Sequence, residues 1–147
     1  MCDYRIAAQE ATFSYPEIDR GTVGGGGAFM RNIGIAEGTV RKLLYTGHVC
    51  SAQEALRLGL VDEVVTYERL MLAAMDLAQR IASKARSALV LMKQGALTAA
   101  AHADWQAAYR ATHHLSAQMT SSNEAKEGMN AFLEKRAAIY PSKPGDN

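Results

Sequence analysis

A run of four consecutive glycines, at positions 24–27, is the feature that most constrains how this chain can fold. Glycine lets the backbone approach another group closely and exposes its N–H groups, but several glycines in a row lose much backbone entropy when they become ordered. A turn with only a structural role does not require that loss, so we expect this loop to hold a ligand. A helix expected to begin near Ala28 would bring its positive dipole end to the same place.

A single carboxylate, Glu17, stands shortly before the glycine run in the segment Tyr15-Pro16-Glu17-Ile18. The proline fixes the local backbone, and a carboxylate beside exposed N–H groups can move protons on a bound molecule. Glu17 is therefore a candidate catalytic residue. The residues alone leave open the alternative of a solvated loop carboxylate or a helix-capping acid.

Size and composition exclude several classes of protein. The 147 residues suit one domain, and 48% of them are hydrophobic against a formal net charge of +1, so nothing marks a nucleic-acid-binding surface. No apolar stretch approaches the roughly 20 residues that a membrane span needs, and no signal segment opens the chain. Cys2 and Cys50 lack the spacing of a disulfide framework, which indicates free thiols in a reducing compartment. We expect a cytoplasmic protein without a membrane or nucleic-acid partner.

The common catalytic motifs are absent. A dinucleotide fingerprint that starts at Gly24 would need a sixth-position glycine where Phe29 stands, and no Gly-Lys-Ser or Gly-Lys-Thr follows the run. The histidines do not pair at the spacing of metal ligands, so we expect no metal site. No Gly-x-Ser-x-Gly elbow supports a nucleophilic serine.

Hydrophobic periodicity predicts a helix-rich chain with a few short strands. The expected extended segments are 4–7, 11–14 and 60–65. Helices are predicted at 28–33, 36–45, 51–58 and 68–85, then around Leu89 to Ala96, around Trp105 to Met119, and through Met129 to Leu133. Ser51 with Glu54, and Ser121 with Glu124, have the spacing of capping boxes, in which serine serves a helix N–H and glutamate reaches back to the cap.

Several segments together match one family in order and spacing. They are Cys2-Asp3-Tyr4-Arg5-Ile6-Ala7, Phe13-Ser14-Tyr15-Pro16-Glu17, Leu44-Tyr45-Thr46-Gly47, the stretch 51–65 that begins Ser51-Ala52-Gln53-Glu54, and the stretch 127–136 that ends Leu133-Glu134-Lys135-Arg136. The chain thereby resembles the C-terminal portion of the crotonase superfamily, the enoyl-CoA hydratase and isomerase family. The stretch 51–65 is the most specific of these segments.

The resemblance implies an α/β fold, the C-terminal part of the crotonase-like ββα spiral, rich in helices and with few short strands. Residues 1–67 would form the part of the core that carries Glu17 and the glycine loop. Residues 68–140 would form a helical oligomerisation region, and 141–147 a loose tail. The family's first glutamate and its two oxyanion N–H donors match no part of this chain.

The resemblance also implies an activity, the hydration of an enoyl-CoA thioester through an enolate stabilised in an oxyanion hole. Glu17 matches the family's second glutamate, which is associated with proton delivery at the α carbon. Tyr15, Pro16 and Gly25 match positions near the substrate, with Gly25 close to the reacting water. Phe132 and Lys135 resemble residues that approach the CoA nucleotide. No cofactor is implied beyond the coenzyme A of the substrate.

The implied partners are an acyl-CoA thioester and further copies of the chain, in a trimer or hexamer of fatty acid metabolism. Two alternatives stay open. One is an enoyl-CoA isomerase of the same family that uses Glu17 as its proton shuttle, and the other is a non-catalytic oligomerisation module. Gly25, in place of an aspartate, disfavours the dienoyl-CoA isomerases, and the presence of Glu17 disfavours the naphthoate synthases.

Overall fold

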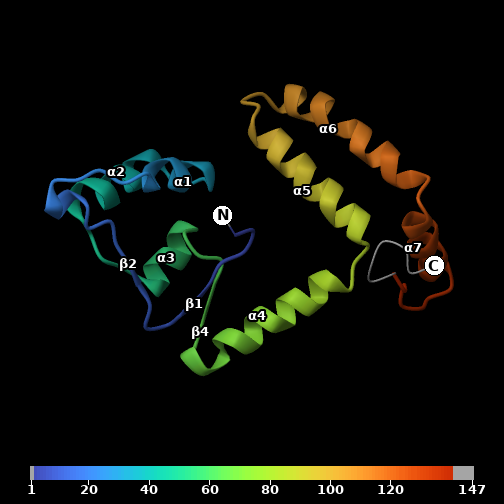
Figure 1. Ribbon diagram of the computed structural model, residues 1–147, viewed down its shortest axis with the longest axis horizontal. Helices are drawn as coiled ribbons and strands as arrows, with labels where there is room; N and C mark the ends of the chain where they lie inside the picture. Colours follow the sequence, from blue (N-terminus) through green and yellow to red (C-terminus); the bar gives the residue numbers. More distant parts are fainter. Residues whose placement is uncertain (1, 141–147) are drawn as a thin grey trace. The chain divides into compact units, whose positions relative to one another are not determined.

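The chain divides into two compact units, Met1–Asp76 and Leu77–Asn147, and each is described here by itself. The computed structural model describes residues 2–140, so the expected loose tail at 141–147 lies outside the described residues. The described strands all belong to the first unit, and the described part of the second is helical (Figure 1). The expectation of a helix-rich chain with few short strands is confirmed.

The first unit alternates short strands with short helices. Its elements are β1 (Ile6–Ala8), β2 (Thr12–Phe13), a 3-10 helix η1 (Ile18–Arg20), α1 (Gly26–Asn32), α2 (Glu37–Thr46), β3 (Cys50–Ser51), α3 (Ala52–Leu58), β4 (Glu63–Val65) and the start of α4 (Tyr67–Ala82). The described strands form two two-stranded sheets, β1 parallel to β4 and β2 antiparallel to β3. In register, Ala7 lies opposite Val64, and Phe13 lies opposite Cys50.

Arg5 and Asp62 hold the parallel pair together at the start of its strands. The Arg5 backbone N–H donates to Asp62 Oδ2 at 2.8 Å, and Arg5 Nη2 donates to Asp62 Oδ1 at 3.0 Å. Arg5 Nε also donates to the Leu60 carbonyl at 2.7 Å. Each of these hydrogen bonds involves the charged Arg5 guanidinium or the charged Asp62 carboxylate, so they are stronger than hydrogen bonds between neutral groups. They set the register of β1 against β4.

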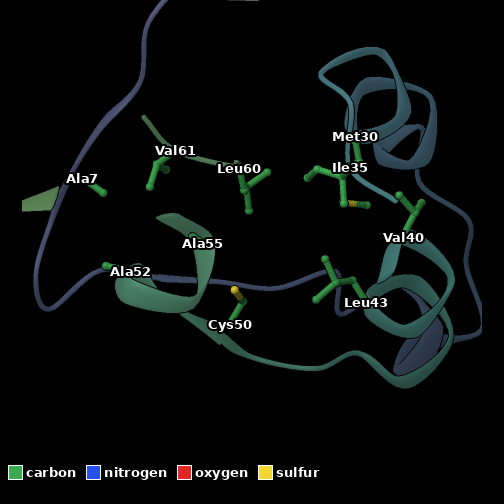
Figure 2. Packing of buried hydrophobic residues seen from close by; sticks show 10 residues of the cluster. All are labelled: Ala7, Met30, Ile35, Val40, Leu43, Cys50, Ala52, Ala55, Leu60 and Val61. Carbon is green, nitrogen blue, oxygen red and sulfur yellow. The ribbon is translucent and has the colours of Figure 1, made fainter. Parts of the chain in front are cut away.

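The core of the first unit gathers small and medium apolar side chains from its helices and strands (Figure 2). Its buried members are Ala7, Met30, Ile35, Val40, Leu43, Cys50, Ala52, Ala55, Leu60 and Val61. The Met30 side chain of α1 is 0% exposed. The thiols of Cys50, which is buried, and Cys2, which is exposed, are both free. Burial raises the pKa of the Cys50 thiol, and the nearby negative charge of Glu54 raises it further. This core fixes α1, and with it the end of the glycine loop.

The expected capping box at α3 forms only in part. The Glu54 backbone N–H donates to Ser51 Oγ at 3.2 Å, and the helix ends at Gly59 with a left-handed φ of 73°. The Glu54 side chain does not reach back to the cap as expected, because its Oε2 lies 2.9 Å from His48 Nε2. That hydrogen bond lowers the pKa of Glu54. The Glu54 carboxylate therefore bonds a histidine side chain that precedes the helix instead of the backbone N–H of its own cap.

The second capping box was placed one residue too early. Ser122, not Ser121, caps α7 (Asn123–Leu133), and its Oγ accepts from the Ala125 backbone N–H at 3.0 Å. Glu124 instead accepts from the Ser87 backbone N–H at 3.0 Å, at the start of α5 (Arg86–Ala100). Here the carboxylate bonds the start of another helix, 37 residues away, rather than its own cap.

The second unit is built around a helical hairpin. α5 and α6 (Trp105–Thr120) lie side by side, and α7 follows α6 (Figure 1). A Cβ on Gly95 of α5 would lie 3.2 Å from Leu115 Cδ1 of α6, so the missing side chain permits the close packing. Among residues 2–140, no helix is long and apolar enough to cross a membrane.

Candidate functional site

The backbone at Glu17 is held by a tight turn between β2 and α1. The Glu17 carbonyl accepts hydrogen bonds from the backbone N–H groups of Arg20 at 3.1 Å and Thr22 at 2.9 Å, and from Thr22 Oγ1 at 3.2 Å. The Asp19 N–H donates to the Pro16 carbonyl at 3.2 Å, which closes the first turn of η1. The turn therefore fixes where the Glu17 side chain starts.

The Glu17 carboxylate has an oxygen that is buried and unpartnered. Within the described part of the chain, Glu17 Oε2 is the one buried side-chain oxygen or nitrogen without a hydrogen-bond partner. Leaving a buried acceptor unsatisfied costs about 1–3 kcal/mol, and more for a charged one. Such an atom calls for an explanation, and a reacting group that awaits its substrate supplies one.

The glycine run passes directly over the side chains that precede it. A Cβ on Gly24 would lie 2.6 Å from Glu17 Oε1, and one on Gly26 would lie 1.8 Å from Tyr15 Cε1. A Cβ on Gly27 would lie 2.9 Å from Leu44 Cδ1, whereas one on Gly25 would meet nothing within 4 Å. Close approach thus explains three of the glycines, and Gly25 faces open space. The helix begins at Gly26, ahead of the expected start near Ala28.

Tyr15 and Pro16 line a pocket in the first unit, with a volume of about 610 Å³. Residues of β1 and β2, Phe29, Leu60 and Val61 also line this pocket. Arg5 is the charged residue in its lining. Tyr15 is partly buried, and burial, followed by the negative charge of Glu17, raises the pKa of its phenol. The hydroxyl therefore stays protonated at neutral pH. The structure brings Tyr15, Pro16, Glu17 and the glycine loop together.

The expected CoA-binding residues, Phe132 and Lys135, lie in the second unit at the end of α7. Phe132 is 78% exposed, and Lys135 has a left-handed φ of 54°, the one positive φ among the non-glycine residues described. A left-handed backbone is unfavourable for a residue with a side chain and persists only where its surroundings impose it. Lys135 takes that conformation as the residue after the C-cap of α7, where the Lys135 N–H donates to the Phe132 carbonyl at 3.2 Å and the Arg136 N–H donates to the Ala131 carbonyl at 3.0 Å.

The next residue, Arg136, forms an ion-pair network that the sequence reasoning did not find. Arg136 donates to Glu127 from Nη1 at 2.6 Å and from Nη2 at 3.0 Å, and its Nε donates to Glu134 at 2.6 Å. Glu127 also accepts from the Ile139 backbone N–H at 2.8 Å. The Arg136 hydrogen bonds, and then that of Ile139, lower the pKa of Glu127 to about 2. Glu127 and Arg136 stand nine residues apart, and Arg136 follows the end of α7, so no helical spacing in the sequence indicates this network.

The second unit also contains an apolar groove of about 1060 Å³ between α5, α6 and α7. Leu91, Met92, Leu115, Met119 and Met129 are among its lining residues, and Lys126 and Asn130 stand in its wall. Among residues 2–140, no cluster of His, Cys, Asp or Glu side chains could hold a metal ion.

The chain is similar to known proteins over nearly its whole length. The family model described as enoyl-CoA hydratase/isomerase matches residues 1–143. A crotonyl-CoA hydratase of Syntrophomonas wolfei is 39% identical over 143 residues, which are 97% of this chain and 55% of that protein. A short-chain-enoyl-CoA hydratase of Clostridium acetobutylicum is 36% identical over 136 residues, 92% of this chain and 52% of that protein.

Solved structures show the same fold. The enoyl-CoA hydratase of Bacillus anthracis superimposes with a TM-score of 0.87 at 32% identity, over 97% of this chain and 55% of that one. The chain thus spans about half the length of the relatives it matches. The expected fold class, the C-terminal part of a crotonase-like fold, is confirmed.

Proposed function

Because this chain belongs to the enoyl-CoA hydratase/isomerase family, we propose that it carries the proton-transferring half of an enoyl-CoA hydratase site. The buried, unpartnered Glu17 Oε2 is the observation that carries the proposal. It is a carboxylate oxygen on a fixed turn, beside a loop that leaves space open at Gly25. A general acid or base needs such a position within reach of the reacting atom.

In the proposed reaction, water adds across the conjugated double bond of an acyl-CoA thioester. The water oxygen bonds to the β carbon, one proton goes to the α carbon, and the π bond is lost. Glu17 moves the proton at the α carbon, and the open face of Gly25 leaves space for the reacting water. An oxyanion hole must stabilise the enolate that forms, and it is usually the largest catalytic contribution. By the resemblance, that hole and the first glutamate belong to the portion of the relatives that this chain does not match.

Phe132 and Lys135 are the proposed contacts to the CoA nucleotide. The exposed Phe132 ring can stack on a base, and the Lys135 ammonium can pair with a phosphate. The end of α7 supports this assignment because its closing hydrogen bonds hold Lys135 in one backbone conformation, and the Arg136–Glu127 ion pair fixes the residue that follows. The trimer or hexamer, the place in fatty acid metabolism, the cytoplasmic location and the absence of a further cofactor stay predictions.

Isomerisation of an enoyl-CoA is the second candidate, and one observation favours it. Glu17 carries the one unpartnered buried carboxylate oxygen of the described residues, and an isomerase can return the proton it removes through a single carboxylate. Hydration needs a second carboxylate to position and deprotonate the water. Product analysis with a β,γ-enoyl-CoA distinguishes the two, because the isomerase yields the conjugated isomer without consuming water.

The test joins the N-terminal half of the similar Syntrophomonas wolfei hydratase ahead of this chain, so that the oxyanion hole and the first glutamate are supplied, and compares crotonyl-CoA hydration with and without Glu17→Gln. We expect kcat to fall by about 100-fold or more, the usual contribution of a general acid or base. Glu10→Gln makes the same carboxylate-to-amide change at an exposed position and serves as the control. A loss below about tenfold on Glu17→Gln would contradict the catalytic role.

The non-catalytic alternative predicts a different pattern. A folded and oligomeric chain that neither hydrates crotonyl-CoA nor gains thermal stability with CoA would support the oligomerisation module instead. Thermal unfolding with and without CoA measures the second property directly, because a ligand that binds the folded state raises its Tm.

A further inference from the structure

Two short segments of the site approach each other at two points. Tyr15 lies against Gly26, and Glu17 lies against Gly24, so the two contacts follow opposite orders along the chain. Both contacts are closer than any side chain would allow, because the built Cβ atoms would stand 1.8 Å from the Tyr15 ring and 2.6 Å from Glu17 Oε1. The glycine loop is therefore shaped around these two side chains.

The two contacts differ in stiffness. A Cβ on Gly26 would overlap two atoms of the Tyr15 ring and its hydroxyl, Cε1 at 1.8 Å, Cζ at 2.4 Å and Oη at 2.6 Å. The ring is a rigid, partly buried plane, so the whole ring has to move to admit that Cβ. The Glu17 contact instead involves the end of a flexible side chain. The Tyr15 ring is thus the rigid spacer between the turn at Glu17 and the first residue of α1.

We propose that Tyr15 and Gly26 act as a size-matched pair of positioning residues, which sets the distance between the Glu17 carboxylate and the glycine loop. This inference rests on the proposed function and deepens it. Tyr15 acts on Glu17 through Pro16, whose ring fixes the backbone between them. Gly26 acts through α1, which the fully buried Met30 anchors in the core. A larger residue at Gly26 must move the ring, the turn or the helix start.

The first test follows Glu17 without depending on catalysis. We expect Gly26→Ala to shift the ¹³C resonance of the Glu17 side-chain carboxyl in the labelled 147-residue chain, and to lower Tm by at least about 2 °C, as overpacking does. Gly38→Ala is the matched control, since a Cβ there meets nothing within 4 Å. It should leave the Glu17 resonance in place. A lowered Tm with an unmoved Glu17 resonance in Gly26→Ala would overturn the proposal, because the contact would then be structural only.

A double-mutant cycle tests the pairing itself. Because Tyr15→Ala removes the ring that Gly26→Ala would strike, the second change should lower Tm much less in the Tyr15→Ala background than in the original chain. Equal Tm losses in the two backgrounds would show that the residues act independently and would overturn the pair.

The kinetic arm separates positioning from binding. We expect Gly26→Ala to lower kcat for crotonyl-CoA by about 100-fold, the effect of a misplacement of about 1 Å, with a smaller change in KM. Tyr15→Phe, which keeps the ring, should recover most of the kcat that Tyr15→Ala loses. A loss confined to KM would overturn the positioning role. These rates are measured with the same supplied N-terminal half. If hydration there is unchanged by Glu17→Gln while the Glu17 resonance still moves as expected in Gly26→Ala, the proposed function fails and the positioning pair stands.

Discussion

Met30 offers the sharpest test of how the core holds α1 in place. Its side chain is 0% exposed and packs among Ile35, Val40 and Leu43 in the cluster of the first unit (Figure 2). Burying a methionine side chain contributes about 1.5–3 kcal/mol by transfer from water. Its removal also leaves a cavity, so Met30→Ala should lower the free energy of unfolding by about 2–5 kcal/mol. That is a large share of the roughly 5–15 kcal/mol of a typical domain.

Urea unfolding followed by far-UV circular dichroism measures this loss as a shift in the transition midpoint at constant slope. Met71→Ala is the matched control, because Met71 lies on α4 in the same unit and is 68% exposed. It should change the free energy of unfolding by no more than about 0.5 kcal/mol. Met30→Leu, which conserves volume, should cost less than about 1.5 kcal/mol. A loss for Met30→Ala no larger than that for Met71→Ala would refute the packing argument.

Two further predictions concern the ends of helices. The pKa of Glu127 is lowered to about 2, so its network stabilises the folded chain above the ordinary carboxyl pKa of 4.5, and this contribution is lost as pH falls from there through about 2. Thermal unfolding between those pH values should therefore be less pH-dependent in Glu127→Gln, and an unchanged pH dependence would contradict the network. Ser51→Ala should lower the free energy of unfolding by about 0.5–2 kcal/mol through loss of the α3 cap. Ser121→Ala, at the serine that does not cap α7, should cost no more than about 0.5 kcal/mol in the same urea assay.

Sequence reasoning predicted the helices well where the signal is local. Ser51 caps α3, and Gly47 and Gly59 follow the ends of α2 and α3 in left-handed conformations. These features depend on neighbouring residues and on the freedom of glycine at positive φ, so they can be predicted without knowledge of the fold. The same reasoning was wrong where another group competes for the carboxylate. Glu54 bonds the His48 side chain six residues away rather than its own cap, and Glu124 bonds Ser87 at the start of another helix.

The strands show the same limit. The extended segments at 4–7 and 60–65 were both predicted, but their pairing was not. The structure pairs β4 in parallel with β1. Arg5 and Asp62, which fix that pairing, stand 57 residues apart in the chain. A parallel pair needs a long crossover between its strands, and no local pattern indicates which two segments will meet. The resemblance to a family, carried by separated motifs, therefore predicted more of the fold than periodicity did.

The amino-acid sequence by itself determined that this chain is helix-rich, which family it belongs to, and that a carboxylate precedes a glycine loop. Tertiary structure decided what the loop packs against. Only folding buries Glu17 Oε2 without a partner and brings the Tyr15 ring against Gly26. The physical reason is that composition and spacing record which side chains are available, whereas burial and close contact depend on segments that meet only when the core around Met30 has formed.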